Sequence, residues 1–290
     1  MSFRESQFIG WATAGLADLA AGRLRVGPGD DGAVLEDGTI VCMDATVEGA
    51  HFAPGTAPDL VARKALGRPL SDLCAMGAQP QTVHVAALLP PGSDGRALAE
   101  ALSRWCRSFD VALAGGDTKR ARPGGLAFAV AATGRCVRGA PWLRSGARAG
   151  DRLVVSGPLG GAARGRHLRV TPRTDVVSAL RDREVDVHAA LDLSDGLGRN
   201  LPQLCAASRV GAIVEAAALP VHADVEPGRD GVLAALDDGE DFELLLAVPP
   251  AAALPDGLVT IGTVTEGGGV LLRRDGRLQS WPGRGYEHEF

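Results

Sequence analysis

Short apolar runs alternate with longer segments whose apolar residues recur every three to four positions through the first half of the chain. The longer spacing predicts amphipathic helices, and the short runs predict strands. Helices are therefore expected at residues 59–76 and 96–109. Strands are expected at residues 39–44, 82–89, 111–114 (short and buried) and 126–133. A further helix is predicted at the N-terminus, where Ser2 and Glu5 can form a capping box.

A polar, Gly- and Arg-rich stretch at residues 144–151 interrupts this pattern, and a new strand begins after it. We place a domain boundary there, between residues 1–145 and 146–290. In the second half a helix is expected around residues 200–207. Strands are expected near residues 153–156, 189–193, 242–248, 259–263 and 270–273. Alternation of strands and helices in both halves predicts an α/β or α+β fold.

Composition narrows the class of protein. Apolar residues make up 46% of the chain and aromatic residues only 4%, so the core must consist mainly of Ala, Val and Leu. The net charge of -5 and the lack of a basic stripe argue against nucleic acid as the main partner. Lys64 and Lys119 are the only lysines.

Cysteine spacing and hydropathy indicate the compartment. The five cysteines are widely spaced without a Cys-x-x-Cys pair, which argues against a zinc site and suits reduced thiols. No run of eighteen apolar residues is present and no signal peptide is visible, so we expect a cytoplasmic protein without membrane attachment.

Aspartates in short Gly- or Ser-containing segments recur across both halves. The segments are Gly29-Asp30-Asp31-Gly32, Met43-Asp44, Ser71-Asp72, Gly115-Gly116-Asp117-Thr118 and Asp192-Leu193-Ser194-Asp195-Gly196. Each has an ordinary explanation by itself, such as an Asp-Gly turn, a strand-terminating acid or a helix cap. So many acids at the ends of apolar strands together predict a dispersed site for hard cations, which commonly serve phosphate chemistry.

Individual residues in and near these segments can be interpreted further. Gly115 and Gly116 would allow a close backbone approach to a phosphate, although no Walker A loop is present. Asp72 lies in an apolar segment, where a buried carboxylate needs a cation, an arginine or a capping role. Glu240 precedes an apolar strand and can equally be part of an ordinary charged loop. His51 alone is more often a structural hydrogen-bonding residue than a ligand.

Taken in order, these segments resemble the thiamine-monophosphate kinase family, within the superfamily of aminoimidazole ribonucleotide synthetase and selenophosphate synthetase. The most specific parts are Ser-Asp-Leu-x-Ala-Met-Gly-Ala at residues 71–78 and Gly-Gly-Asp-Thr at residues 115–118. The resemblance covers almost the whole chain. It implies a two-domain fold: an N-terminal mixed-sheet domain (1–145) that binds ATP and Mg²⁺ and forms a homodimer, and a C-terminal α/β domain (146–290) that completes the active site.

The resemblance also implies an activity and a set of site residues. The activity is phosphorylation of thiamine monophosphate to thiamine diphosphate by direct in-line transfer from ATP, with several Mg²⁺ ions. The implied metal ligands are Asp31, Asp44, Asp72, Asp117, Asp192 and Asp195. The implied nucleotide contacts are Gly116, Asp117, Arg144 and Ser194, and the implied thiamine contacts are His51, Glu240 and Trp281. No side chain is expected to act as a general base, because a phosphate acceptor oxygen with a second pKa of about 6 is already ionised at neutral pH.

The chain departs from the family pattern at several places. Cys42-Met43 stands where the family has Ser/Thr-Thr, Pro69 replaces an Asn, and the segment 156–173 is short. Two alternatives therefore stay open: a kinase or synthetase of the same superfamily that acts on another acceptor, and a non-catalytic nucleotide-binding paralogue. Retention of all six Asp positions favours the kinase, since unused carboxylates in a cluster repel each other.

Overall fold

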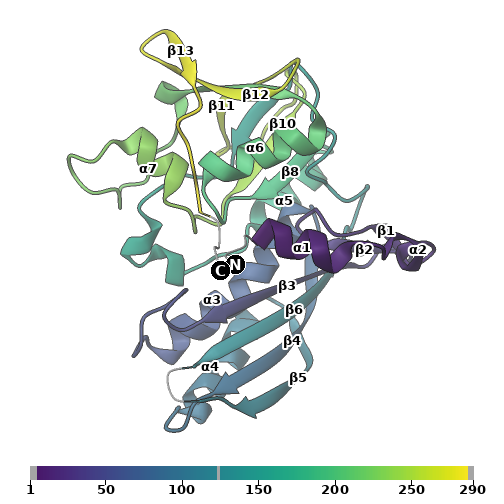
Figure 1. The fold of residues 1–290 in the computed structure, drawn as a ribbon, viewed down its shortest axis with the longest axis vertical. Helices are drawn as coiled ribbons and strands as arrows, with labels where there is room; N and C mark the ends of the chain where they lie inside the picture. Colours follow the sequence, from purple (N-terminus) through teal and green to yellow (C-terminus); the bar gives the residue numbers. More distant parts are fainter. Residues whose placement is uncertain (1–4, 123–124, 287–290) are drawn as a thin grey trace.

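The computed structural model describes residues 5–122 and 125–286, which form two sheets, one in each half of the chain (Figure 1). The helices of the first half are α1 (Glu5–Thr13), α2 (Ala17–Ala20), α3 (Pro58–Ala75) and α4 (Gly95–Ser108). Its strands are β1 (Leu24–Val26), β2 (Ala33–Leu35), β3 (Ile40–Val47), β4 (Gln79–Leu89), β5 (Ala112–Arg120) and β6 (Ala127–Arg135).

The first sheet is mixed, with strand order β1-β2-β3-β6-β4-β5; only the edge pair β4 and β5 is parallel. Helix α3 packs against β3, β6 and α4, and covers one face of the sheet. Val83, Val85, Phe128 and Val130 point from the strands into this core. Alternation of buried and half-buried positions along β6 fits a sheet with one covered face.

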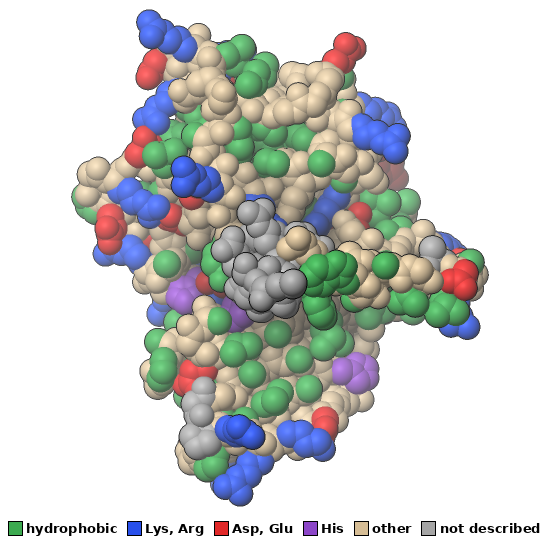
Figure 2. Space-filling view, in the orientation of Figure 1, with side chains coloured by type: hydrophobic (Ala, Val, Ile, Leu, Met, Phe, Trp, Pro, Cys, Tyr) green, Lys and Arg blue, Asp and Glu red, His purple; other side chains and the backbone are tan. Residues whose placement is uncertain are grey.

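The other face of the first sheet is apolar and uncovered. Met43 and Leu88 on this face are 66% and 40% exposed, and every residue of the edge strand β5 is exposed. Figure 2 shows hydrophobic side chains gathered over this lower sheet. An apolar face next to a long open edge strand is typical of a surface that a partner covers.

The second sheet contains seven strands in the order β13-β12-β9-β11-β7-β10-β8 and has helices on both faces. Its strands are β7 (Arg152–Val155), β8 (Ala189–Asp192), β9 (Gly211–Glu215), β10 (Leu244–Val248), β11 (Val259–Thr265), β12 (Gly269–Arg274) and β13 (Arg277–Ser280). The helices are α5 (Thr174–Asp182), α6 (Leu197–Ser208) and α7 (Gly231–Asp237), with short 3₁₀ turns η1 (Ala162–Arg164), η2 (Arg166–Leu168) and η3 (Ala216–Ala218).

Helix α3 joins the two halves. Its N-terminal part lies on the first sheet, whereas Cys74 and Ala75 at its end belong to a core shared with α5 and the second sheet. Pro58 at the start suits the first turn of a helix, and eleven of the next seventeen side chains, together with Gly67, are buried. A helix buried between two sheets can carry polar side chains to their junction.

The predicted fold class and most predicted elements are confirmed, with informative differences. Strand β3 continues to Val47, so Asp44 lies inside a strand rather than at its end. The expectation of a short buried strand at 111–114 is wrong: β5 is a nine-residue exposed edge strand. The sequence pattern did not reveal β1, β2, β9, β13, α5 or α7. The proposed boundary after residue 145 stays a prediction, and Ser2 of the capping box lies outside the described residues.

The structure bears on the expectations about membrane attachment and about the cysteines. Within residues 5–122 and 125–286, no helix has both the length and the apolar character needed to cross a membrane. All five cysteines are free thiols, and four of them are buried.

Candidate functional site

Three carboxylates from distant parts of the chain meet at the junction of the two halves. Asp31 lies in the turn before β2, Asp72 in the last turn of α3, and Asp192 at the end of β8. One carboxylate oxygen of each lies within 4.8 Å of the others. All three are predicted metal ligands, and the structure brings them together.

Local packing fixes this meeting point. The Ser71 hydroxyl on α3 donates a 2.9 Å hydrogen bond to Oδ2 of Asp192, which connects the two halves. At Gly32 a Cβ would lie 3.0 Å from the carbonyl oxygen of Val41, so the turn that carries Asp31 approaches β3 closely. The glycine and serine of these motifs therefore have structural roles beside the acids.

Burial and repulsion make the three carboxylates costly to ionise. Burial is the main cause of a rise in the pKa of Asp31 to about 6 and of Asp192 to about 7, and it raises the pKa of Asp72 well above its usual range. Neighbouring carboxylates add to all three shifts, while Arg144 opposes the shift at Asp31. A nearby cation would reverse these shifts.

The donor set fits a hard divalent cation. The Asp31 side chain is only 1% exposed, so its Oδ2 is shielded from water. This oxygen nevertheless has no hydrogen-bond partner among the described residues. Carboxylate oxygens are the ligands that Mg²⁺ prefers in proteins. An orphaned buried oxygen beside two further carboxylates therefore supports the predicted metal site.

Arg144 and Ser194, the predicted nucleotide contacts, lie beside this cluster. Nη2 of Arg144 is 2.6 Å from Oδ1 of Asp31, and Ser194 donates a 3.3 Å hydrogen bond to Asp192. The neighbouring Asp30 instead accepts hydrogen bonds from the backbone amides of Arg144 and Asp31. Asp30 thus shapes the turn, while Asp31 points into the cluster.

The other three predicted metal ligands do not join this group, and each is paired with a basic side chain. Asp44 lies 3.1 Å from Arg68, Asp117 lies 3.0 Å from Lys119, and Asp195 lies 3.3 Å from Arg199. Asp44 is still near enough to be the second-largest cause of the raised pKa of Asp72. Asp117 is not among the main causes of the raised pKa of any carboxylate in the cluster.

Asp117 lies on the uncovered face of the first sheet. It pairs with Ala86 of β4, which pairs with Ala129 of β6, which in turn pairs with Ala45 of β3. Residues paired in this way share a face, so Asp117 and Asp44 point to opposite faces. Three strand spacings also separate their strands, a distance of roughly 14 Å.

Gly116, an implied nucleotide contact, lies within β5 and not in a loop. Its φ is 157°, and a Cβ at this position would lie 2.0 Å from the carbonyl oxygen of Val85. The structure therefore requires glycine at this position for close packing of β5 against β4.

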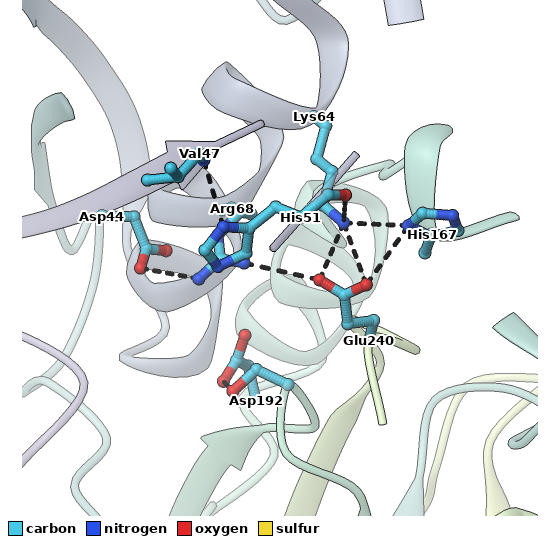
Figure 3. A network of polar contacts seen from close by, with 9 residues as sticks. Asp44, Val47, His51, Lys64, Arg68, His167, Asp192 and Glu240 are labelled. Atoms are coloured by element: carbon cyan, nitrogen blue, oxygen red, sulfur yellow. Dashed lines mark hydrogen bonds and ion pairs between the residues drawn. The ribbon is translucent and has the colours of Figure 1, made fainter. Parts of the chain in front are cut away.

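The predicted acceptor contacts His51 and Glu240 belong to one polar network (Figure 3). Nζ of Lys64 donates to the carbonyl oxygen of His51 at 2.7 Å and to Glu240 at 2.7–2.9 Å. Nδ1 of His167 lies 2.9 Å from Nζ of Lys64 and 3.2 Å from Oε2 of Glu240. Arg68 continues the network from Glu240 to Asp44.

Charges in this network set the ionisation of its members. Burial raises the pKa of Glu240, but His167 and Lys64 outweigh it, and the pKa falls to about 2. Burial, together with Arg68 and Lys64, lowers the pKa of His51 to about 4, so the imidazole is neutral at pH 7. Because Nδ1 of His51 accepts a hydrogen bond from the Val47 amide, the ring proton lies on Nε2.

The loop that carries Glu240 is conformationally strained. Glu240 and Phe242 both have a φ of 53°, a left-handed conformation that residues other than glycine seldom adopt. The loop borders a pocket of about 330 Å³ that is also lined by Arg169 and Arg173. Strained backbone next to a pocket is a frequent feature of binding sites.

Trp281, the third predicted acceptor contact, lies on the second domain beside α6. Its indole N–H donates a 2.8 Å hydrogen bond to the carbonyl oxygen of Gly198, and the ring packs against the core under α6. The chain then runs back to the cluster, where the Tyr286 amide donates to the carbonyl oxygen of Asp195. The C-terminal segment is thus fixed across the start of α6.

Two departures from the family pattern contact each other. The Cys42 thiol donates to the carbonyl oxygen of Pro69 across 3.0 Å, and Cys42 is 6% exposed. Pro69 lies inside α3 without ending the helix. The two changes therefore form one local packing arrangement behind the carboxylate cluster.

Lys64, Arg68 and His167 were not identified from the sequence. A signal existed for the first two, because Lys64, Arg68 and Asp72 are spaced four residues apart and so share one face of α3. His167 gave no such signal, since it lies in a short 3₁₀ turn of an irregular segment.

Comparison with known proteins agrees with this geometry. Residues 29–136 match the family described as AIR synthase related protein, N-terminal domain, and residues 148–274 match its C-terminal domain. The chain is 36% identical to the thiamine-monophosphate kinase of Rhodopirellula baltica, with 80% of this chain and 78% of that protein aligned. It is 34% identical to the Escherichia coli K12 thiamine-monophosphate kinase, with 91% and 92% aligned.

Solved structures give the same relationship. A structure described as AaThiL complexed with AMPPCP and TMP superimposes with a TM-score of 0.86 at 26% identity, covering 98% of this chain and 97% of that one. The thiamine monophosphate kinase of Aquifex aeolicus gives a TM-score of 0.81 at 25% identity, covering 96% and 100%.

Proposed function

The chain belongs to the thiamine-monophosphate kinase family, and we propose that it transfers the γ-phosphoryl group of ATP to thiamine monophosphate, producing thiamine diphosphate and ADP. The observation that carries the proposal is the buried cluster of Asp31, Asp72 and Asp192, drawn from both halves of the chain. Three carboxylates at one point have an evident use only where a cation holds them against anionic reactants.

In the proposed reaction the bond between the γ-phosphorus and the β–γ bridging oxygen breaks, and a phosphate oxygen of thiamine monophosphate forms the new bond. Mg²⁺ held by Asp31, Asp72, Asp192 and Asp44 would neutralise the phosphate charges. Arg144 lies beside Asp31, where its guanidinium is available for the nucleotide phosphates. No side chain needs to remove a proton, because the acceptor phosphate is already ionised.

The remaining predicted residues bind the organic part of the acceptor. Glu240 is ionised and lies at a pocket, so it suits a cationic or amino-bearing heterocycle. His51 presents a neutral ring with its proton on Nε2, which suits an acceptor atom. Trp281 is assigned to the acceptor by the family resemblance, which gives Asp195 as a metal ligand instead; the segment 281–286 connects the two residues.

We further propose that the protein is a homodimer formed through the uncovered face of the first sheet. Met43 and Leu88 on this face are exposed, and β5 is an open edge of nine residues. Because β5 presents Asp117 on the same face, a second copy docked there would receive this carboxylate. Asp117 lies three strand spacings from Asp44 and on the opposite face of the sheet, so we infer that it does not act within its own chain. We therefore assign it to the active site of the partner subunit.

A coupled assay of ADP release with thiamine monophosphate and Mg²⁺ tests the activity. Asp72→Asn should abolish turnover, whereas Asp59→Asn on the exposed start of the same helix should not. Faster turnover of a different phosphorylated acceptor would favour the alternative substrate. Binding of ATP without turnover of any acceptor would favour the non-catalytic paralogue.

Mixing two inactive variants tests the assignment of Asp117. Asp72→Asn and Asp117→Asn should each be inactive as homodimers. If Asp117 serves the partner's site, a mixed dimer has one site with both defects and one intact site, so an equal mixture should regain about a quarter of wild-type activity. No recovery, despite confirmed subunit exchange, would contradict the assignment.

Localisation is the remaining part of the proposal. The five free thiols support a reducing compartment such as the cytoplasm.

A further inference from the structure

Lys64 is a buried cation whose hydrogen-bonding capacity is fully used. Its side chain is 0% exposed, and Nζ lies within 2.9 Å of the carbonyl oxygen of His51, the carboxylate of Glu240 and Nδ1 of His167. An ammonium has three N–H donors and no acceptor, and the carbonyl oxygen of His51 with the two carboxylate oxygens of Glu240 can accept all three. Nδ1 of His167 lies 3.2 Å from Oε2 of Glu240 as well, so His167 contacts both members of this ion pair.

These three partners come from three separate segments of the chain. His51 lies after β3 in the first half, whereas His167 and Glu240 lie in η2 and in the loop before β10 in the second half. Figure 3 shows Lys64 reaching from α3 to the point where the segments meet. One ammonium group thus fixes the relative positions of two predicted acceptor contacts, His51 and Glu240.

Burying an ammonium without solvent is unfavourable unless every donor is paired. Lys64 contacts no predicted metal ligand. The unfavourable burial of its ammonium group therefore needs another explanation. The arrangement at Glu240 indicates this explanation. Lys64 contacts both carboxylate oxygens of Glu240. The Glu240 side chain is 31% exposed and lies beside the pocket that Arg169 and Phe242 also line. A carboxylate offers about four acceptor positions, so Glu240 retains capacity for a ligand.

We propose that Lys64 is a positioning residue for the acceptor site, which holds Glu240 and the His51 backbone in the arrangement that binds the heterocyclic part of thiamine monophosphate. This inference rests on the proposed kinase function. Lys64 itself does not contact the reacting atoms. Its loss should therefore weaken acceptor binding and leave the phosphoryl transfer step and ATP binding largely intact.

Steady-state kinetics of Lys64→Met, which keeps the side-chain length but removes the donors, tests the proposal. We expect KM for thiamine monophosphate to rise about 10- to 100-fold, the range for loss of a charge-assisted hydrogen bond at a binding group. The KM for ATP and kcat should stay within about threefold of wild type. Calorimetry with thiamine monophosphate should show the same loss of affinity without turnover. Lys64→Arg, which keeps the charge, should recover part of it.

A double-mutant cycle tests whether Lys64 acts through Glu240. Glu240→Gln should also raise KM for the acceptor, and the double variant should be no worse than the poorer single variant, because both changes disrupt the same contact. If Lys64→Met does not fold, the cycle is run with Lys64→Arg. Gln79→Ala is the matched structural control: it removes a 2.8 Å hydrogen bond to Ser178 that also joins the two halves but lies outside the network.

Three results would overturn the inference. An unchanged acceptor KM in Lys64→Met excludes a role in acceptor binding. Additive effects in the cycle show that Lys64 does not act through Glu240. An equal rise in acceptor KM for Gln79→Ala shows a general loosening of the two halves. A wild-type protein that neither binds nor phosphorylates thiamine monophosphate would instead overturn the proposed function, and this inference with it.

Discussion

Replacing Asp192 by Asn is expected to stabilise the metal-free protein while it abolishes the Mg²⁺-dependent activity. Asp192 is 2% exposed, and burial with neighbouring carboxylates raises its pKa from 3.8 to about 7. That difference of about 3 units corresponds to roughly 4 kcal/mol of unfavourable free energy for the ionised group at pH 8. Asn has nearly the same shape and carries no charge.

The expected gain is smaller than this figure. Asp31 and Asp72 share protons with Asp192, so removing one charge relieves only part of the repulsion. The Asn side chain also keeps only one oxygen to accept the hydrogen bonds that Ser71 and Ser194 donate. We expect a net stabilisation of about 1–3 kcal/mol, or roughly 2–10 °C in Tm for a chain of this size.

The gain should depend on pH with a definite sign. The folded-state pKa of Asp192 lies above the unfolded value, so its contribution destabilises the wild type progressively as pH rises from about 4 to above 7. At pH 5 the wild-type carboxyl is largely protonated, and the difference between the two proteins should shrink.

Thermal unfolding at pH 5 and pH 8, in EDTA and in Mg²⁺, measures these effects. Wild type should gain stability from Mg²⁺ at pH 8, and Asp192→Asn should gain little. Asp59→Asn, which removes an exposed charge, controls for net charge. The reasoning fails if Asp192→Asn is less stable than wild type in EDTA at pH 8, or if its advantage is the same at both pH values.

Further changes address the first sheet. Gly116→Ala should lower the free energy of unfolding by several kcal/mol, because the new Cβ would meet the Val85 carbonyl. In Gly115→Ala the new Cβ meets only the His84 ring, so the loss of stability should be smaller. The Tm of each variant measures the effect. Met43→Asp places a charge on the apolar outer face and should yield an inactive monomer by sedimentation analysis. Cys42→Ser keeps a donor to the Pro69 carbonyl and should retain activity within about threefold in the coupled assay.

The elements that the sequence predicted best are those with long, unambiguous patterns. Helix α3 was predicted to within a residue at each end, because its apolar residues recur over five turns and Pro58 marks the start. The shorter elements β1, β2 and β13 were missed, since three or four residues carry too little periodicity. Strand β9 and α7 were missed because they are short and mix Ala and Gly with Val, Leu or Ile, so their patterns suit either structure.

The acidic positions illustrate a second limit. Ordered motifs pointed to six aspartates, but a motif does not reveal which face of a sheet a residue occupies. Asp44 and Asp117 both lie on strands of the first sheet, yet the register places them on opposite faces. Register depends on pairing between strands that are far apart in the sequence, and here it separates the predicted ligand Asp117 from the predicted ligand Asp44.

Helix α3 shows how the acceptor and metal regions are connected. Lys64, Arg68 and Asp72 follow one another at intervals of four residues along one face, from the acceptor network to the carboxylate cluster. Arg68 lies between them and pairs with both Asp44 and Glu240.

If Asp44 turns to a bound cation, Arg68 loses one of its two carboxylate partners and becomes available to a phosphate between the two regions. The proposed metal and acceptor sites would then share Arg68, which predicts that Mg²⁺ and thiamine monophosphate bind with mutual dependence. Calorimetry of thiamine monophosphate binding with and without Mg²⁺ would measure this coupling. Equal affinities in wild type would show that Arg68 does not link the two sites.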